Sequence, residues 1–139
     1  FYAESPATPL PANAGDYTAF AARIETDRAL DLTLPPLARD AAAWTDPIDC
    51  ATCQALADAA RGGGIEAILY RSVRDPKGRR NIALLTAKGF AAREPVERQT
   101  WRIRLSATGV QALCDFPRRL VGFAVVDFLS DGRLKGRFG

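Results

Sequence analysis

The sequence predicts an α+β fold with a mixed, largely antiparallel sheet and a few helices, and three observations support this class. Short apolar or alternating runs are typical of strands, and they occupy residues 17–24, 30–33, 65–70, 100–106, 110–116 and 120–129. Helical patterns occur at residues 37–44 and again from Asp46 to the glycines at 62–64. Turn signals rich in Gly, Pro and Asp separate most of these segments, which favours hairpins between neighbouring strands.

The totals describe an ordinary globular chain. With 139 residues, of which 47% are hydrophobic, the chain is long enough for one domain with a real core. Nineteen basic against 16 acidic residues permit anionic ligands, but this surplus is too small to indicate nucleic acid. No segment approaches the roughly 20 apolar residues of a membrane span. We therefore expect a cytoplasmic protein that binds neither membranes nor, directly, nucleic acid.

The start of the chain indicates a piece of a longer protein. The sequence contains no Met, begins with Phe1 and shows no signal peptide. Residues 1–15 hold three prolines among small residues and are predicted to be a linker from an upstream segment. Residues 16–139 are then expected to be the C-terminal portion of a single domain.

The first half is expected to hold a hairpin and then helices. Strands 17–24 and 30–33 are close enough in sequence to pair with each other. A short helix is predicted at 37–44. A longer helix is predicted to start at Asp46, because its side chain can accept a capping hydrogen bond and Pro47 after it has a φ preset for the first helical position. Gly62 to Gly64 are expected to end it, since glycine adopts positive φ without penalty.

Three cysteines bear on metal and redox chemistry. Cys50 and Cys53 have the spacing of a redox or zinc pair, but the predicted helix places both within it rather than at its N-terminal edge. The chain has no His to complete a zinc site, and Cys114 is distant in sequence. We therefore interpret the cysteines as reduced structural thiols and expect no metal.

The run from 64 to 85 organises the rest of the chain. Residues 65–70 form an apolar run that suits a central strand, and Asp75-Pro76-Lys77-Gly78 suits a type I turn that leads into a second strand. Pairing about this turn places three residue pairs opposite each other on one face: Arg74 with Arg79, Ser72 with Asn81, and Tyr70 with Ala83.

This predicted face has two interpretations. Two arginines directly opposite repel each other unless an anion lies between them or both extend into water. The face is therefore either a pocket for a phosphate-bearing ligand or a solvated hairpin tip.

Two further groups of basic residues lie later in the chain. Arg102 and Arg104 alternate with apolar residues, which indicates a solvated strand face. The basic end at 133–139 either forms one strand of a last hairpin or frays.

Two classes of site are excluded by what the chain lacks. The triple glycine follows a helix and precedes a strand, which is the reverse of the order in phosphate-binding loops. With no His, this chain supports neither serine–histidine nor cysteine–histidine catalysis. Any chemistry must come from carboxylates, hydroxyls, arginines or a partner segment.

Several runs together resemble the RES-domain family. They are NAGDYTAF at 13–20, ALDLT at 29–33, GIEAILYRSVRD at 64–75, RNIALL at 80–85 and RQTW at 98–101. The resemblance implies a toxin of a toxin–antitoxin pair with a fold related to the ADP-ribosyltransferase core. It also implies degradation of NAD by phosphorolysis or hydrolysis, or transfer of its ADP-ribose to a protein. The implied partner is an antitoxin with an Xre-type helix-turn-helix domain.

The resemblance also implies site residues. Ser72 matches the family's Ser, and Arg74 and Asn81 match its Ser-x-Arg and downstream Asn, while the family's Arg and Glu are expected upstream of Phe1. Ser72 is then the catalytic-site residue and orients the substrate, because the chain offers no base to make it a nucleophile. Arg74, Asn81 and Tyr70 are the candidate NAD-binding residues. The alternatives are a non-catalytic module that binds anions or nucleic acid, and an inactive fragment that docks an antitoxin.

Overall fold

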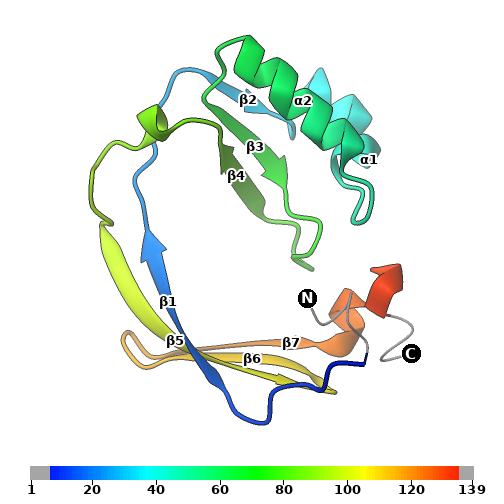
Figure 1. The fold of residues 1–139 in the computed structure, drawn as a ribbon, viewed down its shortest axis with the longest axis vertical. Coiled ribbons are helices and arrows are strands. Elements are labelled where there is room, and N and C mark those ends of the chain that lie inside the picture. Colours follow the sequence, from blue (N-terminus) through cyan, green and yellow to red (C-terminus); the bar gives the residue numbers. More distant parts are fainter. Residues whose placement is uncertain (1–6, 135–139) are drawn as a thin grey trace. The chain divides into compact units, whose positions relative to one another are not determined.

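The computed structural model describes residues 7–134 of the chain and confirms the α+β class, with two largely antiparallel sheets and a few helices (Figure 1). The chain divides into two compact units. Among the described residues, one unit combines 7–21 with 95–134, and the other spans 22–94. Within the predicted linker, residues 7–14 form neither helix nor strand, whereas Gly15 already belongs to the first strand. Residues 1–6 of the linker and 135–139 of the predicted basic end lie outside the described residues.

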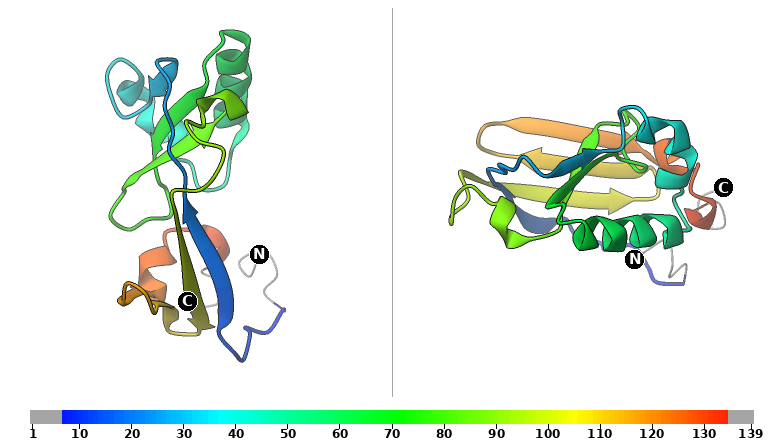
Figure 2. Two further views of the ribbon diagram at one scale, coloured as in Figure 1. Left: turned by 90° about the vertical axis from the view of Figure 1, so that its left-hand side faces the viewer. Right: turned by 90° about the horizontal axis from the view of Figure 1, so that it is seen from above.

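The first unit is a four-stranded antiparallel sheet in the order β1-β5-β6-β7 (Figure 1 and Figure 2). Its strands and the 3-10 turn that follows them are β1 Gly15–Ala21, β5 Glu97–Ser106, β6 Gly109–Cys114, β7 Arg119–Ala124 and η3 Val125–Phe128. The predicted strand at 120–129 is therefore too long. The Asp127 carboxylate accepts a hydrogen bond from the Ala124 N–H at 2.9 Å, which turns the chain at that point.

The second unit holds a three-stranded sheet in the order β2-β3-β4. Its elements are β2 Ala29–Asp31, η1 Leu37–Asp40, α1 Ala41–Trp44, α2 Ala51–Gly62, β3 Ala67–Arg71, β4 Arg80–Leu84 and η2 Ala87–Gly89. The apolar run at 65–70 is the central strand, as predicted. β3 runs parallel to β2 and antiparallel to β4.

The predicted hairpin between the first two strands is wrong. β1 pairs with β5, and β2 pairs in parallel with β3. A parallel pair needs a long crossover connection, and the helical segment between β2 and β3 supplies it. Proximity in sequence favoured the hairpin, but the parallel pairing lets α2 cover one face of the sheet.

The core of this unit lies between α2 and that face (Figure 1 and Figure 2). Leu32, Ala60 and Ile68 are its buried centre. Half-buried apolar side chains surround them: Leu30, Leu37, Trp44, Leu56, Ala57, Ile65, Tyr70, Ala83 and Leu85. Because strand side chains alternate, Tyr70 and Ile68 point to the same face, which is the one that α2 covers.

The sequence predicted the C-terminal end of α2 correctly, but not its start. The end at the glycines is confirmed: the Gly63 N–H donates to the Ala59 carbonyl at 2.9 Å, and Gly64 has a φ of 73°. The start is five residues later than Asp46. The Asp46 carboxylate accepts hydrogen bonds from the Ile48 and Asp49 N–H groups, both at 2.8 Å, and so closes a separate turn before the helix.

Candidate functional site

The turn between β3 and β4 forms at the predicted residues. The Gly78 N–H donates to the Asp75 carbonyl at 2.7 Å, and the Asp75 carboxylate accepts from the Lys77 N–H at 3.1 Å. Gly78 has a φ of 58°, which favours glycine. The four-residue turn predicted from Asp75-Pro76-Lys77-Gly78 is therefore present.

The predicted pairing of the two strands is wrong by two residues. Tyr70 lies opposite Asn81, and the Ser72 N–H donates to the Arg79 carbonyl at 2.9 Å. The Ser72 Oγ accepts a hydrogen bond from the Asp75 N–H at 3.2 Å, so Val73 and Arg74 leave the strand ladder and widen the loop. A slip of two residues keeps every side chain on its predicted face, because strand side chains alternate with a period of two.

The structure brings three of the four candidate residues to one face of this sheet. Tyr70 and Asn81 are directly opposite, and Ser72 follows Tyr70 on the same face. Tyr70 is half-buried against the core, Ser72 is half-buried and Asn81 is exposed. The face therefore changes from apolar at Ile68 to hydroxyl and amide groups at its end.

A pocket of about 270 Å³ lies beside this face, within the same unit. Apolar atoms make up most of its lining, as is usual for small-molecule sites. The lining residues are Leu32, Trp44, Asp46, Cys50, Cys53, Leu56, Ala57, Ile68, Tyr70, Val73, Arg74 and Ala83. Tyr70 and Arg74 thus belong to the pocket, whereas Ser72 and Asn81 are not among its lining residues.

The predicted arginine pair does not form. The Arg79 Nε donates to the Asp75 carboxylate at 2.5 Å, and an Arg74 Nη2 donates to the Pro47 carbonyl at 3.1 Å. Each of these two guanidinium groups therefore has its own acceptor, on a different segment. The shift in register separates them further, because Arg74 leaves the ladder.

A different pair of arginines lies directly opposite across the two strands. Arg71 and Arg80 face each other on the opposite side of the sheet from Tyr70. Arg80 lies 3.5 Å from the Asp31 carboxylate, while Arg71 has no ion pair among the described residues. The Arg71 guanidinium lies against Gly78, at the place where a Cβ would stand. The sequence predicted one pair of opposite arginines across these strands. Because the predicted register was wrong by two residues, that pair was Arg74 with Arg79 instead of Arg71 with Arg80.

The acidic side chain of the turn titrates at unusually low pH. Arg79 donates hydrogen bonds to Asp75, and this lowers the pKa of the Asp75 carboxyl from 3.8 to about 2. Because the folded pKa is lowered, the ionised carboxylate stabilises the folded turn above pH 4. That stabilisation is lost as the pH falls from about 4 to about 2.

We therefore predict that the stability difference between the wild type and Asp75→Asn shrinks as the pH is lowered through this window. Urea unfolding at a series of pH values between 6 and 2 measures it. A difference that stays constant throughout contradicts the assignment of the low pKa to Asp75. A carboxyl NMR titration of the wild type gives the same pKa independently.

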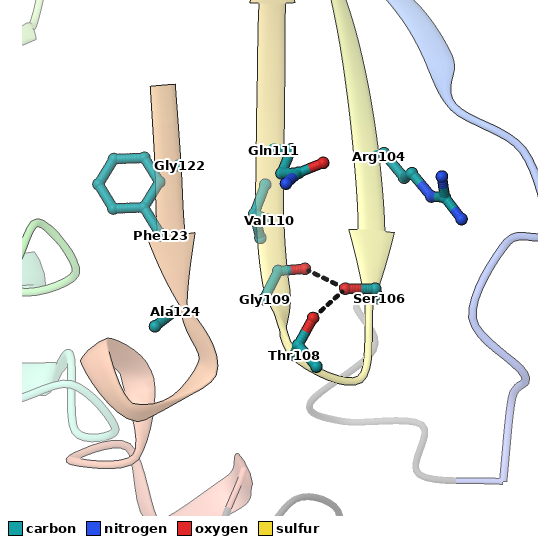
Figure 3. A pocket seen from close by; sticks show the side chains of 9 residues that line it. All are labelled: Arg104, Ser106, Thr108, Gly109, Val110, Gln111, Gly122, Phe123 and Ala124. Atoms are coloured by element: carbon teal, nitrogen blue, oxygen red, sulfur yellow. Dashed lines mark hydrogen bonds between the residues drawn. The ribbon is translucent and has the colours of Figure 1, made fainter. Parts of the chain in front are cut away.

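The four-stranded unit contains a second pocket, of about 440 Å³ (Figure 3). It is lined by Arg104, Ser106, Thr108, Gly109, Val110, Gln111, Gly122, Phe123 and Ala124. The Ser106 Oγ bonds to the Gly109 carbonyl at 3.2 Å and to the Thr108 Oγ1 at 2.9 Å, as Figure 3 shows. Arg104 and Arg102 are exposed, as predicted, and Arg102 lies 3.4 Å from Asp16. None of the four candidate site residues lines this pocket.

Cys50 and Cys53 lie nearer the start of α2 than the sequence predicted. Cys50 caps the N-terminus of α2 and is exposed, while Cys53 lies in its first turn and is half-buried. The expectation that both lie inside the helix is wrong, because α2 begins later than predicted. All three cysteines are free thiols. Over residues 7–134, no group of three or more His, Cys, Asp or Glu side chains is placed to hold a metal ion.

Comparison with known families assigns the chain. The RES domain model matches residues 1–106 of the 139. The chain therefore belongs to the RES domain family, which is toxin-like and associated with NAD processing. No curated protein sequence matches the chain. Among the described helices, none is long and apolar enough to cross a membrane.

Proposed function

We propose that this chain is the NAD-binding part of a toxin that cleaves the bond between nicotinamide and ribose. The observation that supports this best is the end of β3, where Tyr70 enters an apolar pocket and Ser72 follows on the same face. In a chain of the RES family, NAD is the substrate that such a face suits. The ADP-ribose is transferred to phosphate, to water or to a protein side chain.

Ser72 orients the ribose in this proposal. Its Oγ accepts the hydrogen bond from the Asp75 N–H, which leaves the hydroxyl proton to be donated to a ribose oxygen. No His exists in the chain to activate the hydroxyl, so a nucleophilic role has no support. The half-buried position of Ser72 holds the hydroxyl in place next to the pocket.

The other candidates bind the rest of the dinucleotide. Tyr70 lines the pocket and offers a ring face on which a flat nicotinamide or adenine ring stacks. Asn81 is directly opposite Tyr70 and exposed, so its amide is accessible to a ribose or carboxamide group. Arg74 lines the same pocket and donates one hydrogen bond to the Pro47 carbonyl, which leaves its other N–H groups for the diphosphate.

The reaction itself builds positive charge on the ribose. Breaking the bond to nicotinamide gives an oxocarbenium-like transition state, which a carboxylate stabilises. We assign no residue of this chain to that carboxylate. The residues named above bind and orient the substrate, so that the bond being broken meets the charge-stabilising group in a fixed geometry.

The wider biological setting follows the family. We propose a cytoplasmic toxin that an antitoxin with an Xre-type helix-turn-helix domain silences, with residues 1–15 as a linker and 16–139 as the C-terminal part of a RES-like domain. Mass spectrometry of NAD incubated with full-length protein, with and without phosphate, tests the activity. ADP-ribose phosphate, free ADP-ribose or a modified protein identifies the acceptor. NAD that stays intact with folded protein refutes the proposal.

The alternative of an anion-binding module has less support. Five basic residues surround the turn: Arg71, Arg74, Lys77, Arg79 and Arg80. Asp75 pairs with Arg79, Asp31 pairs with Arg80, and Arg74 donates to a carbonyl. Carboxylates thus neutralise two of the five charges. Binding that ignores NAD and falls steeply with added salt would favour this alternative.

A further inference from the structure

Two cysteines lie one helical turn apart at the start of α2. The Gln54 N–H donates to the Cys50 carbonyl at 2.9 Å, which closes the first turn of the helix around Cys50 and Cys53. Residues three apart on a helix have Cβ atoms about 5–6 Å from each other. Disulfides join cysteines whose Cα atoms are about 4.4–6.8 Å apart. The Cβ atoms of a disulfide are about 3.5–4.5 Å apart. A disulfide between these residues therefore needs the first turn of the helix to tighten by about 1–2 Å, in addition to rotation of both side chains.

The two thiols have different surroundings. Cys50 is exposed, whereas Cys53 is half-buried with its Sγ 3.8 Å from the carbonyls of Ala43 and Trp44. Burial is the largest cause that raises the pKa of the Cys53 thiol, and nearby acidic groups add to it. An oxidant from solvent therefore reaches Cys50 first, and Cys53 is the thiol that reacts in a second step.

Both cysteines line the 270 Å³ pocket together with Tyr70 and Arg74. We propose that Cys50 and Cys53 form a reversible dithiol–disulfide site, and that its oxidation changes this pocket. Disulfide formation itself is independent of the proposed function, and only the effect on NAD turnover rests on it.

The oxidation balances with a peroxide as the oxidant. The Cys50 thiolate attacks the O–O bond of hydrogen peroxide, which gives a sulfenic acid and, after protonation, one water. The Cys53 sulfur then attacks the Cys50 sulfur, the S–S bond forms and the hydroxyl leaves as a second water. Two thiols thus lose two electrons and two protons to one peroxide. Thiol–disulfide exchange with an excess of a small dithiol reverses the reaction.

The disulfide moves Cys53 away from its present contacts. The Cys53 Sγ lies beside the Ala43 and Trp44 carbonyls, and the Trp44 ring nitrogen donates to the Leu37 carbonyl at 2.8 Å. Rotating the sulfur toward Cys50 changes the wall that Trp44 and Cys53 share in the pocket. We expect oxidation to lower NAD turnover several-fold, and dithiol treatment to restore it.

Peptide mass spectrometry of the full-length protein tests the site directly. Both cysteines fall on the tryptic peptide 40–61, and Cys114 falls on 105–118. After peroxide treatment, denaturation and alkylation, we expect peptide 40–61 to be unalkylated and lighter by two hydrogens than its reduced form. Cys114 is completely buried in the folded protein, which protects it from peroxide. It is therefore expected to stay reduced and to be alkylated after denaturation in the same sample.

Three serine variants complete the test. Cys114→Ser is expected to form the disulfide like the wild type, whereas Cys50→Ser and Cys53→Ser are expected to form none within peptide 40–61. A wild type whose peptide carries only sulfinic or sulfonic acid, or no change, overturns the site. A wild type that forms the disulfide but consumes NAD at the same rate before and after oxidation overturns the effect on the pocket. A protein without NAD activity refutes the proposed function instead, and leaves the peptide result to decide the site.

Discussion

Replacing Ser72 by alanine is expected to lower the rate of NAD consumption by about 10- to 100-fold, which is the loss that misplacing a bound substrate causes. Two contacts disappear with the hydroxyl. The Asp75 N–H loses its acceptor at 3.2 Å, and in the proposed function the ribose loses a donor as well. Each tenfold corresponds to about 1.4 kcal/mol of transition-state stabilisation.

Ser106→Ala is the matched control for this variant. Ser106 is also a half-buried serine at the end of a strand, and its Oγ also bonds within a turn. Consumption of NAD by the two variants is compared at equal concentrations of folded protein, which circular dichroism verifies. If Ser72→Ala retains the wild-type rate, or if Ser106→Ala loses as much, Ser72 has no special role in the site.

Replacing Gly109 by alanine is expected to destabilise the four-stranded sheet by about 2–5 kcal/mol, through backbone strain and overpacking together. Gly109 has a φ of 144°, which side chains rarely tolerate. A Cβ built there runs into the backbone carbonyl of Phe123 on β7. Because this obstacle is backbone, no side-chain rotation relieves the overlap, and the β5–β6 hairpin has to move.

Gly122→Ala is the control on the neighbouring strand. A Cβ on Gly122 meets no atom nearer than the Val110 carbonyl oxygen at 3.9 Å, which is ordinary contact. We expect its stability to lie within about 1 kcal/mol of the wild type, since only strand propensity changes. Urea unfolding of both variants measures the difference. Equal stabilities of the two variants contradict the proposed clash with Phe123.

Local chemistry made part of the fold predictable. The turn at Asp75 to Gly78 and the end of α2 at the glycines depend on residues a few positions apart, whose backbone preferences are strong. The central strand β3 was visible as an apolar run. The alternation along β5 likewise indicated that Arg102 and Arg104 lie on an exposed face.

Pairing and exact boundaries could not be predicted from the sequence in the same way. The parallel pair of β2 and β3 depends on packing against α2, which proximity in sequence does not indicate. The two-residue error between β3 and β4 arose because the Ser72 hydroxyl and the Asp75 carboxylate bond to the loop backbone instead of letting the strands continue. The same kind of bond at Asp46 delayed α2 and moved Cys50 to its cap.

The error in register had a limited effect on the candidate site. Because it was even, Tyr70, Ser72 and Asn81 kept their common face. Arg74 is different, since it belongs to the loop, and its placement depends on the hydrogen bond to Pro47. The pocket itself could not be predicted, because α1, α2 and the sheet close it jointly.

The hydrogen bond from Arg74 to the Pro47 carbonyl joins two loops that are 27 residues apart in sequence. An anion that attracts the whole guanidinium group competes with that carbonyl, and an exposed bond of this kind is worth about 0.5–1.5 kcal/mol. For the proposed dinucleotide site, we therefore expect an affinity up to roughly tenfold weaker than the contacts with Arg74 alone provide. Ligands that approach Arg74 without breaking its hydrogen bond to the Pro47 carbonyl avoid this loss. We therefore expect Arg74 to favour anions that approach from that direction.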